Sequence, residues 1–309
     1  DAPPRIYGHE TAGTVAASRA QRWREGARVA LLHHVPCRAC DRCAAGLIAH
    51  CPHFKKNGTT AGFEPAGGGY AAYVRALGWI AERGTFSVPD SVPTERAAFL
   101  EPVNTCLKAV RSVARGGGPR GSEPPRTVRG AGRGPVGLTL GARARREGGE
   151  GGAGDPIAER RARAAALGAR SAHAPDDPAL AETLRALPLG GPDAAFVATP
   201  AGAAVASALD AVRPGGTVVP FGHTGLAMPL TVDGGQVGVG EKRIAGSYGA
   251  DETLCGEVLD LFAEGAFRPE ELVSHRPELE ACAEVFAAAR APGPDTLKIL
   301  FLPHGAAAR

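Results

Sequence analysis

Hydrophobic positions in the first third of the chain form short runs that glycine, proline and cysteine interrupt. Three of these runs, at 13–16, 28–32 and 70–74, have the composition of β-strands. Spacing typical of a helix first occurs at 102–114, where Pro102 suits the first helical turn. The pattern predicts a β-rich domain and a change of fold class near residue 102.

Farther along, strand and helix patterns alternate. Residues 194–198 and 217–221 are apolar runs of strand length, and the helical pattern at 201–212 lies between them. Strands that alternate with helices predict a doubly wound α/β domain, with a parallel sheet covered on both faces. Strand-like patterns at 272–276 and 296–302 can return the chain to the first domain.

One stretch is poor in apolar residues. Between residues 115 and 154 only four positions are Val, Leu, Ile or Phe. Strands of a parallel sheet are normally near-continuous apolar runs, whereas here they read TVRGA and GEGGAG. Ordering costs roughly 1–2 kcal/mol per backbone residue, so we expect poor strands and loose packing at 115–154.

Length and charge narrow the function classes. A chain of 309 residues predicts roughly two domains. A net charge of +3 is too small to indicate nucleic acid or an anionic membrane as the main partner, and no apolar run has the length of a bilayer span. These features predict a soluble protein of a reducing compartment, the cytoplasm.

Four cysteines lie within fifteen positions, in the run PCRACDRCAAGLIAHC. They are Cys37, Cys40, Cys43 and Cys51. Thiolates at this spacing can form the closed tetrahedral ligand set of a structural zinc. A disulfide framework is the alternative, but seven cysteines in the whole chain do not resemble a disulfide-dense scaffold. His50 and His53 are nearby rival ligands, which we assign to the loop surface because four cysteines complete the shell.

A glycine motif indicates a dinucleotide site. Gly132, Gly134 and Gly137 satisfy G-x-G-x-x-G, and Asp155 follows at the distance where a carboxylate meets a ribose 2′-hydroxyl. Asp155 can also serve as the N-cap of the helix that follows, and both roles can coexist. Its negative charge favours NAD over NADP, although Arg160 nearby weakens that preference.

A second set of possible ligands consists of His9, Glu10 and Glu101. An imidazole with carboxylates suits a catalytic zinc that keeps one position open. Each residue also has an ordinary alternative role. His9 can be a histidine in a turn, Glu10 an acid on the surface, and Glu101 an acid that stabilises a helix N-terminus.

These motifs together resemble the zinc-dependent medium-chain dehydrogenases, the alcohol, sorbitol and threonine dehydrogenase group. The segments are GHETAGTV at 8–15, the four-cysteine loop, GGGYAAYV at 67–74, FLEP at 99–102, GRGPVG at 132–137, Asp155, RPGGTVVPFG at 213–222 and EKRIAGSYG at 241–249. The resemblance implies a GroES-like catalytic domain from 1–108 and 270–309, and a Rossmann NAD(P)-binding domain from 109–269.

The resemblance also implies roles for residues. The four cysteines would hold the structural zinc and His9 the catalytic zinc, with Glu10 a ligand or its close neighbour. Glu101 falls where the family has a cysteine or glutamate, and the glutamate form indicates the polyol or threonine branch. The chain starts at Asp1, and no cysteine precedes Cys37, although the family's first catalytic ligand is a cysteine upstream of GHE. We therefore expect an N-terminally truncated form with a weakened catalytic zinc site.

The expected function is hydride transfer between a small secondary alcohol or polyol and NAD(P), in a dimer or tetramer of this chain. The alternative is a non-catalytic zinc-binding fragment or interaction protein derived from the same family. A zinc-ribbon module that binds nucleic acid would need a clustered basic face, which the arginine distribution does not indicate.

Overall fold

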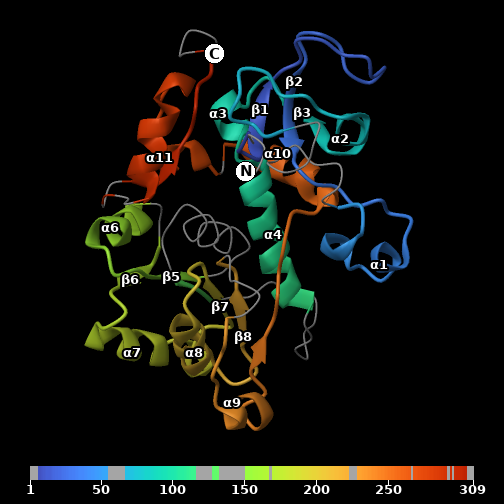
Figure 1. Ribbon diagram of the computed structural model, residues 1–309. Helices are drawn as coiled ribbons and strands as arrows, with labels where there is room; N and C mark the ends of the chain where they lie inside the picture. The colour runs from blue at the N-terminus through green and yellow to red at the C-terminus, as the bar shows by residue number, and fades with distance from the viewer. Residues whose placement is uncertain are drawn as a thin grey trace. The chain divides into compact units, whose positions relative to one another are not determined.

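The computed structural model divides the chain into two compact units (Figure 1). Unit 1 consists of Asp1–Thr105 and Gly249–Arg309, and unit 2 of Cys106–Tyr248. The described residues are 6–54, 67–115, 127–131, 150–166, 169–222, 228–265, 267–290, 293 and 296–304. The glycine motif at 132–137 therefore lies outside them.

Unit 1 contains a small antiparallel sheet in the order β1-β2-β3. Its strands are Glu10–Thr14, Arg28–Leu32 and Thr85–Ser87, and Thr14 pairs with Arg28. A second, parallel pair joins β10 (Val273–His275) to β11 (Lys298–Ile299). The helices of the unit are α1 (Asp41–Ala44), α2 (Gly78–Arg83), α3 (Thr94–Ala97), α10 (Cys255–Ala263) and α11 (Cys282–Arg290).

The strand predicted at 70–74 does not form. Instead, Gly69 and Tyr70 donate backbone hydrogen bonds to the carbonyls of Gly8 and Tyr7. The backbones approach so closely that a Cβ on Gly68 would lie 2.3 Å from the Tyr7 carbonyl oxygen. The glycines of GGGY thus allow the backbone to pass close to Tyr7 and Gly8, next to His9. The β-type pattern alone had indicated a strand there.

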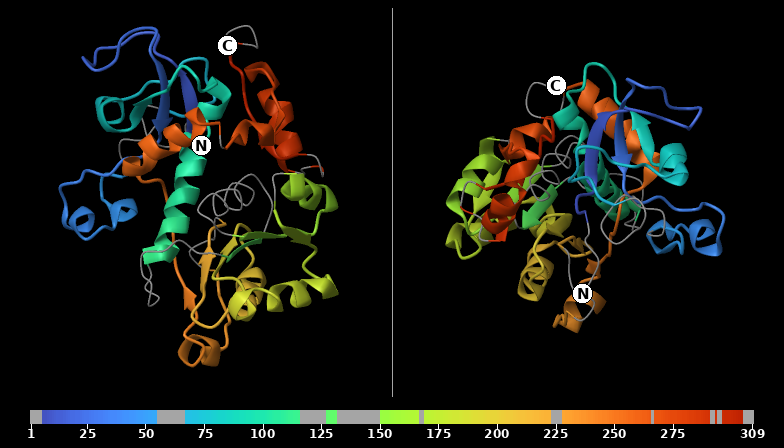
Figure 2. Two further views of the ribbon diagram at one scale, coloured as in Figure 1. Left: turned by 180° about the vertical axis from the view of Figure 1, so that it is seen from behind. Right: turned by 45° about the horizontal axis from the view of Figure 1, so that its top comes forward.

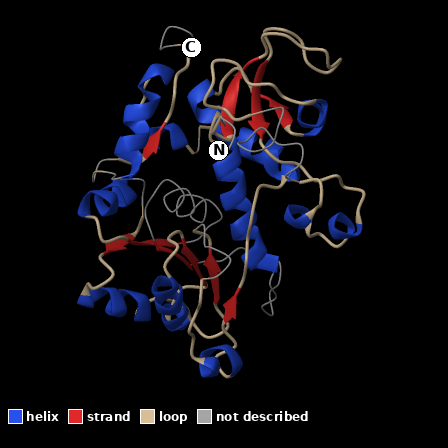
Figure 3. Cartoon of the chain, in the orientation of Figure 1, coloured by secondary structure: helices blue, strands red, loops and turns tan. Residues whose placement is uncertain are grey.

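Unit 2 contains a six-stranded parallel sheet, drawn in red in Figure 3, in the order β6-β5-β4-β7-β8-β9. Renumbered within the sheet, this is the 3-2-1-4-5-6 order of dinucleotide-binding folds. The strands are β4 (Thr127–Ala131), β5 (Glu150–Gly154), β6 (Ser171–His173), β7 (Ala194–Val197), β8 (Thr217–Pro220) and β9 (Arg243–Ile244). The predicted fold class is confirmed.

Both faces of this sheet are covered. Ala194 and Phe196 of β7 pack with the C-terminal part of α4 (Leu100–Arg115), whereas Ala195 and Val197 pack with α8 (Gly202–Ala211). This alternation follows from the two-residue period of a strand. Figure 2 shows α8 against the sheet from behind. The described part of the unit also contains α6 (Ala158–Ala166), α7 (Pro178–Arg185) and α9 (Gly234–Gly238).

The weak segments β4 and β5 form strands, and the expectation of loose packing at 115–154 stays a prediction. They pair in parallel from Thr127↔Glu150 to Ala131↔Gly154, and β4 also pairs with β7. Main-chain hydrogen bonds need no apolar side chain, and Val128 of β4 packs with the buried Ala194 and Phe196 of β7. The rest of 115–154 lies outside the described residues.

Residues 249–269 belong to unit 1, whereas the sequence analysis grouped them with the nucleotide domain. The reason is a buried anchor: Arg96 of α3 donates to the Phe262 carbonyl of α10 at 2.7 Å and forms an ion pair with Glu270 at 2.6 Å. The family domain boundaries at 108 and 270 stay a prediction. Within the described part of the chain, no helix is long and apolar enough to cross a bilayer.

Candidate metal centres

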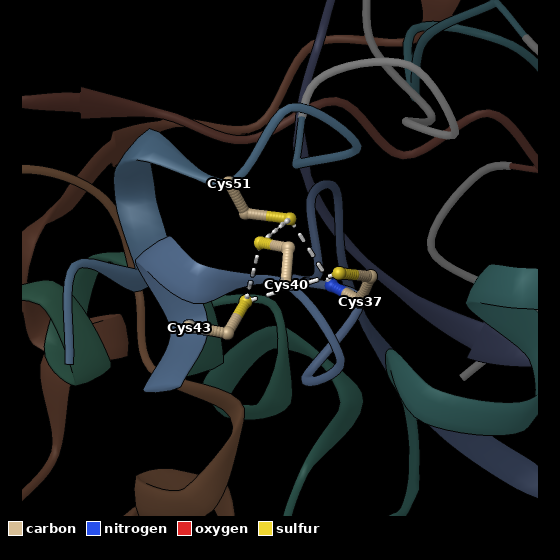
Figure 4. Close-up of side chains that lie close together, drawn as sticks. All are labelled: Cys37, Cys40, Cys43 and Cys51. Atoms are coloured by element: carbon tan, nitrogen blue, oxygen red, sulfur yellow. Dashed lines mark hydrogen bonds between the residues drawn. The ribbon is translucent and has the colours of Figure 1, made fainter. Parts of the chain in front are cut away.

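The four cysteines converge in unit 1, as Figure 4 shows. Cys40 is the N-cap of α1, Cys43 lies one turn later, and Cys51 follows the short turn Ile48–His50. The Sγ atoms are 3.9 Å apart for Cys37 and Cys43, 3.6 Å for Cys40 and Cys43, and 4.0 Å for Cys40 and Cys51. A tetrahedral zinc with bonds of about 2.3 Å needs sulfur separations of about 3.8 Å. The set therefore fits one zinc ion.

Backbone N–H groups surround these sulfurs. Cys51 Sγ accepts from the amides of Cys37 (3.3 Å) and His53 (3.4 Å), and Cys37 Sγ accepts from Ala39 (3.4 Å). Such donors stabilise a thiolate, and the Ala39 amide is the main cause that lowers the pKa of Cys37 to about 6. Burial raises the pKa of Cys43 to about 11, a charge cost that a bound cation would remove. His50 and His53 are exposed and are not members of the group.

The lobe that carries the cysteines is anchored to the segment that enters α10. Arg38, at a positive φ of 58°, binds Asp251 at 3.0 Å and Glu252 at 2.5 Å. Phe54 lies against Gly249, whose added Cβ would meet the ring at 3.1 Å. Partly exposed ion pairs contribute at most about 1 kcal/mol each. Among the described residues of the lobe, the buried cluster consists of Cys43, Cys51 and Phe54. Metal binding is thus the main candidate for what holds the lobe together.

A second cluster brings together His9, Glu10 and Glu101, whose possible ligand atoms all lie within 4.8 Å of one another. His9 precedes β1, Glu10 begins it, and Glu101 is in the first turn of α4. Glu101 is buried, and desolvation raises the pKa of its carboxyl to about 7. Desolvation and the charge of Lys298 lower the pKa of His9, which favours the neutral imidazole that binds metals.

Two residues that the sequence analysis did not select join this cluster. The His33 ring is 4.6 Å from the His9 ring, centroid to centroid, and His33 Nδ1 is 3.9 Å from Glu101 Oε1. Lys298 of β11 forms an ion pair with Glu10. The available signals were a histidine pair directly after the apolar run of β2, and a lysine inside the apolar run TLKILFL. Neither signal selects its residue, because neither His33 nor Lys298 belongs to a group of residues at the spacing typical of metal ligands.

Comparison with known proteins identifies the family. A model of the alcohol dehydrogenase GroES-like domain matches residues 1–89, and a model of zinc-binding dehydrogenases matches residues 135–264. The Mycobacterium tuberculosis protein named "Probable alcohol dehydrogenase adh" is 32% identical over 317 residues, which cover 91% of this chain and 79% of that protein. The chain belongs to the zinc-binding alcohol dehydrogenase family.

Two further comparisons give the same picture. Sorbitol dehydrogenase of Bacillus subtilis is 31% identical over 137 residues, but this match spans only 44% of the chain and 35% of that enzyme. Alcohol dehydrogenase TADH from Thermus sp. ATN1 superimposes with a TM-score of 0.81 at 26% identity, over 97% of this chain and 85% of the other. The GroES-like and Rossmann architecture implied by the sequence is confirmed.

In the Rossmann unit of this chain, β4 ends at Ala131, directly before the glycine motif. Asp155 follows β5 and is buried, and its Oδ1 accepts the Ile157 amide at 2.9 Å. Asp155 therefore forms a local hydrogen bond just before α6, which starts at Ala158, and is not the N-cap itself. Arg160 is partly buried, and its Nε has no hydrogen-bond partner among the described residues. Its predicted role near the nucleotide stays a prediction.

Proposed function

We propose that the chain transfers a hydride between a small secondary alcohol or polyol and NAD(P), with zinc at both centres. The observation that supports this most is that a member of this family has two clusters of possible metal ligands with different chemistry. Four thiolates form a closed set, whereas His9, Glu10 and Glu101 offer nitrogen and oxygen ligands. Closed sulfur sets are structural, and mixed sets with an open position are catalytic.

The residues define what each part contributes. A zinc ion held by His9 and Glu101 would supply Lewis acidity, which lowers the pKa of a bound alcohol. Burial of Glu101 keeps water away from its carboxylate, so the ionised carboxylate would attract a bound cation more strongly. The nucleotide would bind at the carboxyl ends of the parallel strands, where the strand order reverses between β4 and β7.

The same proposal includes a homo-oligomer. The edge strand β9 and the preceding α9 segment of unit 2 expose a group of large apolar side chains, with Val239 92% exposed. The members are Val237, Val239, Ile244 and Tyr248. An exposed sheet edge with apolar neighbours suits pairing with a second copy.

The first test measures zinc content and activity on one preparation. We expect two zinc ions per chain by elemental mass spectrometry, and reduction of NAD⁺ with sorbitol, xylitol or 2,3-butanediol as substrate. Two zincs without saturable nucleotide binding would contradict the proposed oxidoreductase. One zinc per chain, together with no nucleotide binding, would instead identify a non-catalytic zinc protein.

Cofactor preference gives a separate prediction at Asp155. Replacing Asp155 with serine keeps a side chain that can accept the Ile157 amide but removes the negative charge. If the carboxylate binds the ribose, the lost charged hydrogen bond of about 1.5–3 kcal/mol lowers kcat/KM for NAD by roughly 10- to 150-fold. Kinetics with NAD and NADP would measure this change.

The matched control is Asp233→Ser. Asp233 accepts the Gly235 amide at 2.8 Å, the same hydrogen bond to the amide two residues on that Asp155 forms with Ile157. We expect this variant to keep its cofactor kinetics. Unchanged NAD kinetics in Asp155→Ser would show that Asp155 serves only this local hydrogen bond.

A further inference from the structure

One short segment joins the two clusters of possible metal ligands within unit 1. His33 and His34 follow β2 directly, and Cys37 lies four positions after His33 on the same segment. His33 Nδ1 is 3.9 Å from Glu101 Oε1 of the second cluster, whereas Cys37 is one of the four thiols. A displacement at one end of this segment can therefore reach ligands at the other.

Four rings form a row between the same two clusters, which we call the ring row. The centroid separations are 4.6 Å for His9 and His33, 4.0 Å for His33 and His34, and 5.3 Å for His34 and Phe54. His34 and Phe54 are buried, at 7% and 2% exposure. Because interior side chains are close-packed, a ring that shifts must move its neighbour.

Zinc in the cysteine lobe would fix the far end of the ring row. Phe54 packs with Cys43 and Cys51, and its amide donates to the Cys51 carbonyl at 3.0 Å. A metal ion that binds these two thiols therefore also sets the position of the Phe54 ring. Because metal binding and local folding are coupled in such loops, the lobe has two states, a loaded one and a looser empty one.

We propose that zinc in the cysteine lobe strengthens metal binding at the His9–Glu10–Glu101 cluster, with His34 as the positioning residue between the two sites. In the loaded state Phe54 supports His34, and His34 supports His33. His33 in turn restricts the His9 ring and the Glu101 carboxylate. Ligands that are already held in place lose less conformational entropy when the metal binds, so the affinity rises. This inference rests on the proposed function of both clusters as zinc sites.

The size of the effect follows from the kind of contact. Coupling between two sites of one protein commonly changes affinity by about 5- to 150-fold. The ring row supports ligands without supplying one, so we expect a value at the lower end, about five- to tenfold. The effect is mutual, because linkage requires zinc at the His9–Glu10–Glu101 cluster to tighten the cysteine site by the same factor.

The test measures the zinc affinity of the His9–Glu10–Glu101 cluster with the lobe loaded and empty. Calorimetric titration gives this affinity in wild type, whose four thiols fill first, and in Cys43→Ser, whose lobe lacks its full ligand set. We expect the cluster to bind zinc about five- to tenfold more weakly in Cys43→Ser. Equal affinities would overturn the inference and leave the proposed function standing, whereas absence of a second zinc from wild type would overturn both.

Substitutions of His34 isolate the route. In a His34→Ala background, Cys43→Ser should weaken zinc binding at the cluster by less than about twofold, because the ring row is already interrupted. His34→Phe keeps a ring at this position and should keep the full effect of Cys43→Ser. The matched control is His50→Ala, which removes an exposed histidine of the lobe outside the ring row and should also keep it. A full effect in the His34→Ala background would overturn the inference.

Phe54→Leu gives a second test that does not depend on the folding of Cys43→Ser. It leaves all four thiols in place and removes the ring next to His34. We expect this variant to keep the zinc of the lobe in a chelator competition and to bind zinc at the cluster about fivefold more weakly. Retention of the lobe zinc with unchanged affinity at the cluster would overturn the inference.

Discussion

Cys43→Ser is expected to remove one zinc ion per chain and to lower Tm by about 6–12 °C. Structural zinc sites bind with roughly 10–16 kcal/mol in small peptides, and only part of this energy is coupled to the stability of a larger domain. A coupled loss of about 3 kcal/mol gives the stated range, at roughly 2–4 °C per kcal/mol for domains of this size. Elemental mass spectrometry and thermal unfolding measure the two effects.

The matched control is Cys282→Ser, which makes the same atomic change at the start of α11, outside the four-cysteine group. We expect it to keep all of its zinc and to change Tm by less than about 2 °C, as for most substitutions away from a special site. Equal zinc content in Cys43→Ser and wild type would show that the four thiols do not form the site.

Loss of the zinc in Cys43→Ser should also destabilise residues outside the cysteine lobe. Arg38 and Phe54 connect the cysteine lobe to Gly249, Asp251 and Glu252. Hydrogen exchange in Cys43→Ser should therefore accelerate at 249–255 as well as at 37–54. Faster exchange at 37–54 alone would mean that these contacts contribute little to the stability of 249–255.

Local patterns predicted much of this fold. The helix at 201–212 and the strands at 194–198 and 217–221 match α8, β7 and β8 to within one residue at each end. Strands β7 and β8 are buried almost throughout, and α8 is buried along one side, so their apolar patterns reflect their surroundings. The cysteine cluster was predictable for a similar reason, because its ligands lie within one short loop.

Contacts between distant segments were not predictable in this way. The bond between Glu10 and Lys298 spans 288 positions, and nothing in TLKILFL indicates which acid the lysine meets. The strands β4 and β5 show the same limit, because they depend on neighbours rather than on their own residues. Where a strand was predicted, Gly68 instead lies against the backbone of Tyr7. The pattern of hydrophobic residues cannot indicate such a close approach of two backbone segments.

Glu101→Gln is expected to abolish the second zinc site and with it nearly all oxidoreductase activity. A carboxylate is a ligand for zinc, whereas a neutral amide is a much weaker one. The control is Glu284→Gln, an exposed acid in the first turn of α11, as Glu101 is in the first turn of α4. If Glu101 served only the helix N-terminus, both variants would lose only a few tenths of a kcal/mol to about 1 kcal/mol of stability and keep their zinc.

The pH dependence provides an independent check of the same residue. Folding raises the pKa of Glu101 from 4.5 to about 7, so the folded protein without this zinc binds the proton more tightly than the unfolded chain does. Stability from this group is complete below pH 4.5 and is lost as pH rises through about 7, by on the order of 3 kcal/mol. Without the second zinc, Glu101→Gln should therefore equal wild type at pH 4.5 and exceed its stability at pH 8.

Zinc should reverse that order. Binding requires the deprotonated carboxylate, so the affinity of the second site should rise by about tenfold per pH unit below pH 7 and level off above it. At pH 8 with saturating zinc, wild type should then be more stable than Glu101→Gln, because a ligand that binds only the folded state stabilises it. Thermal unfolding of both proteins, with and without the second zinc, measures this reversal. A stability difference with the same sign in both conditions would contradict the role of Glu101 as a metal ligand.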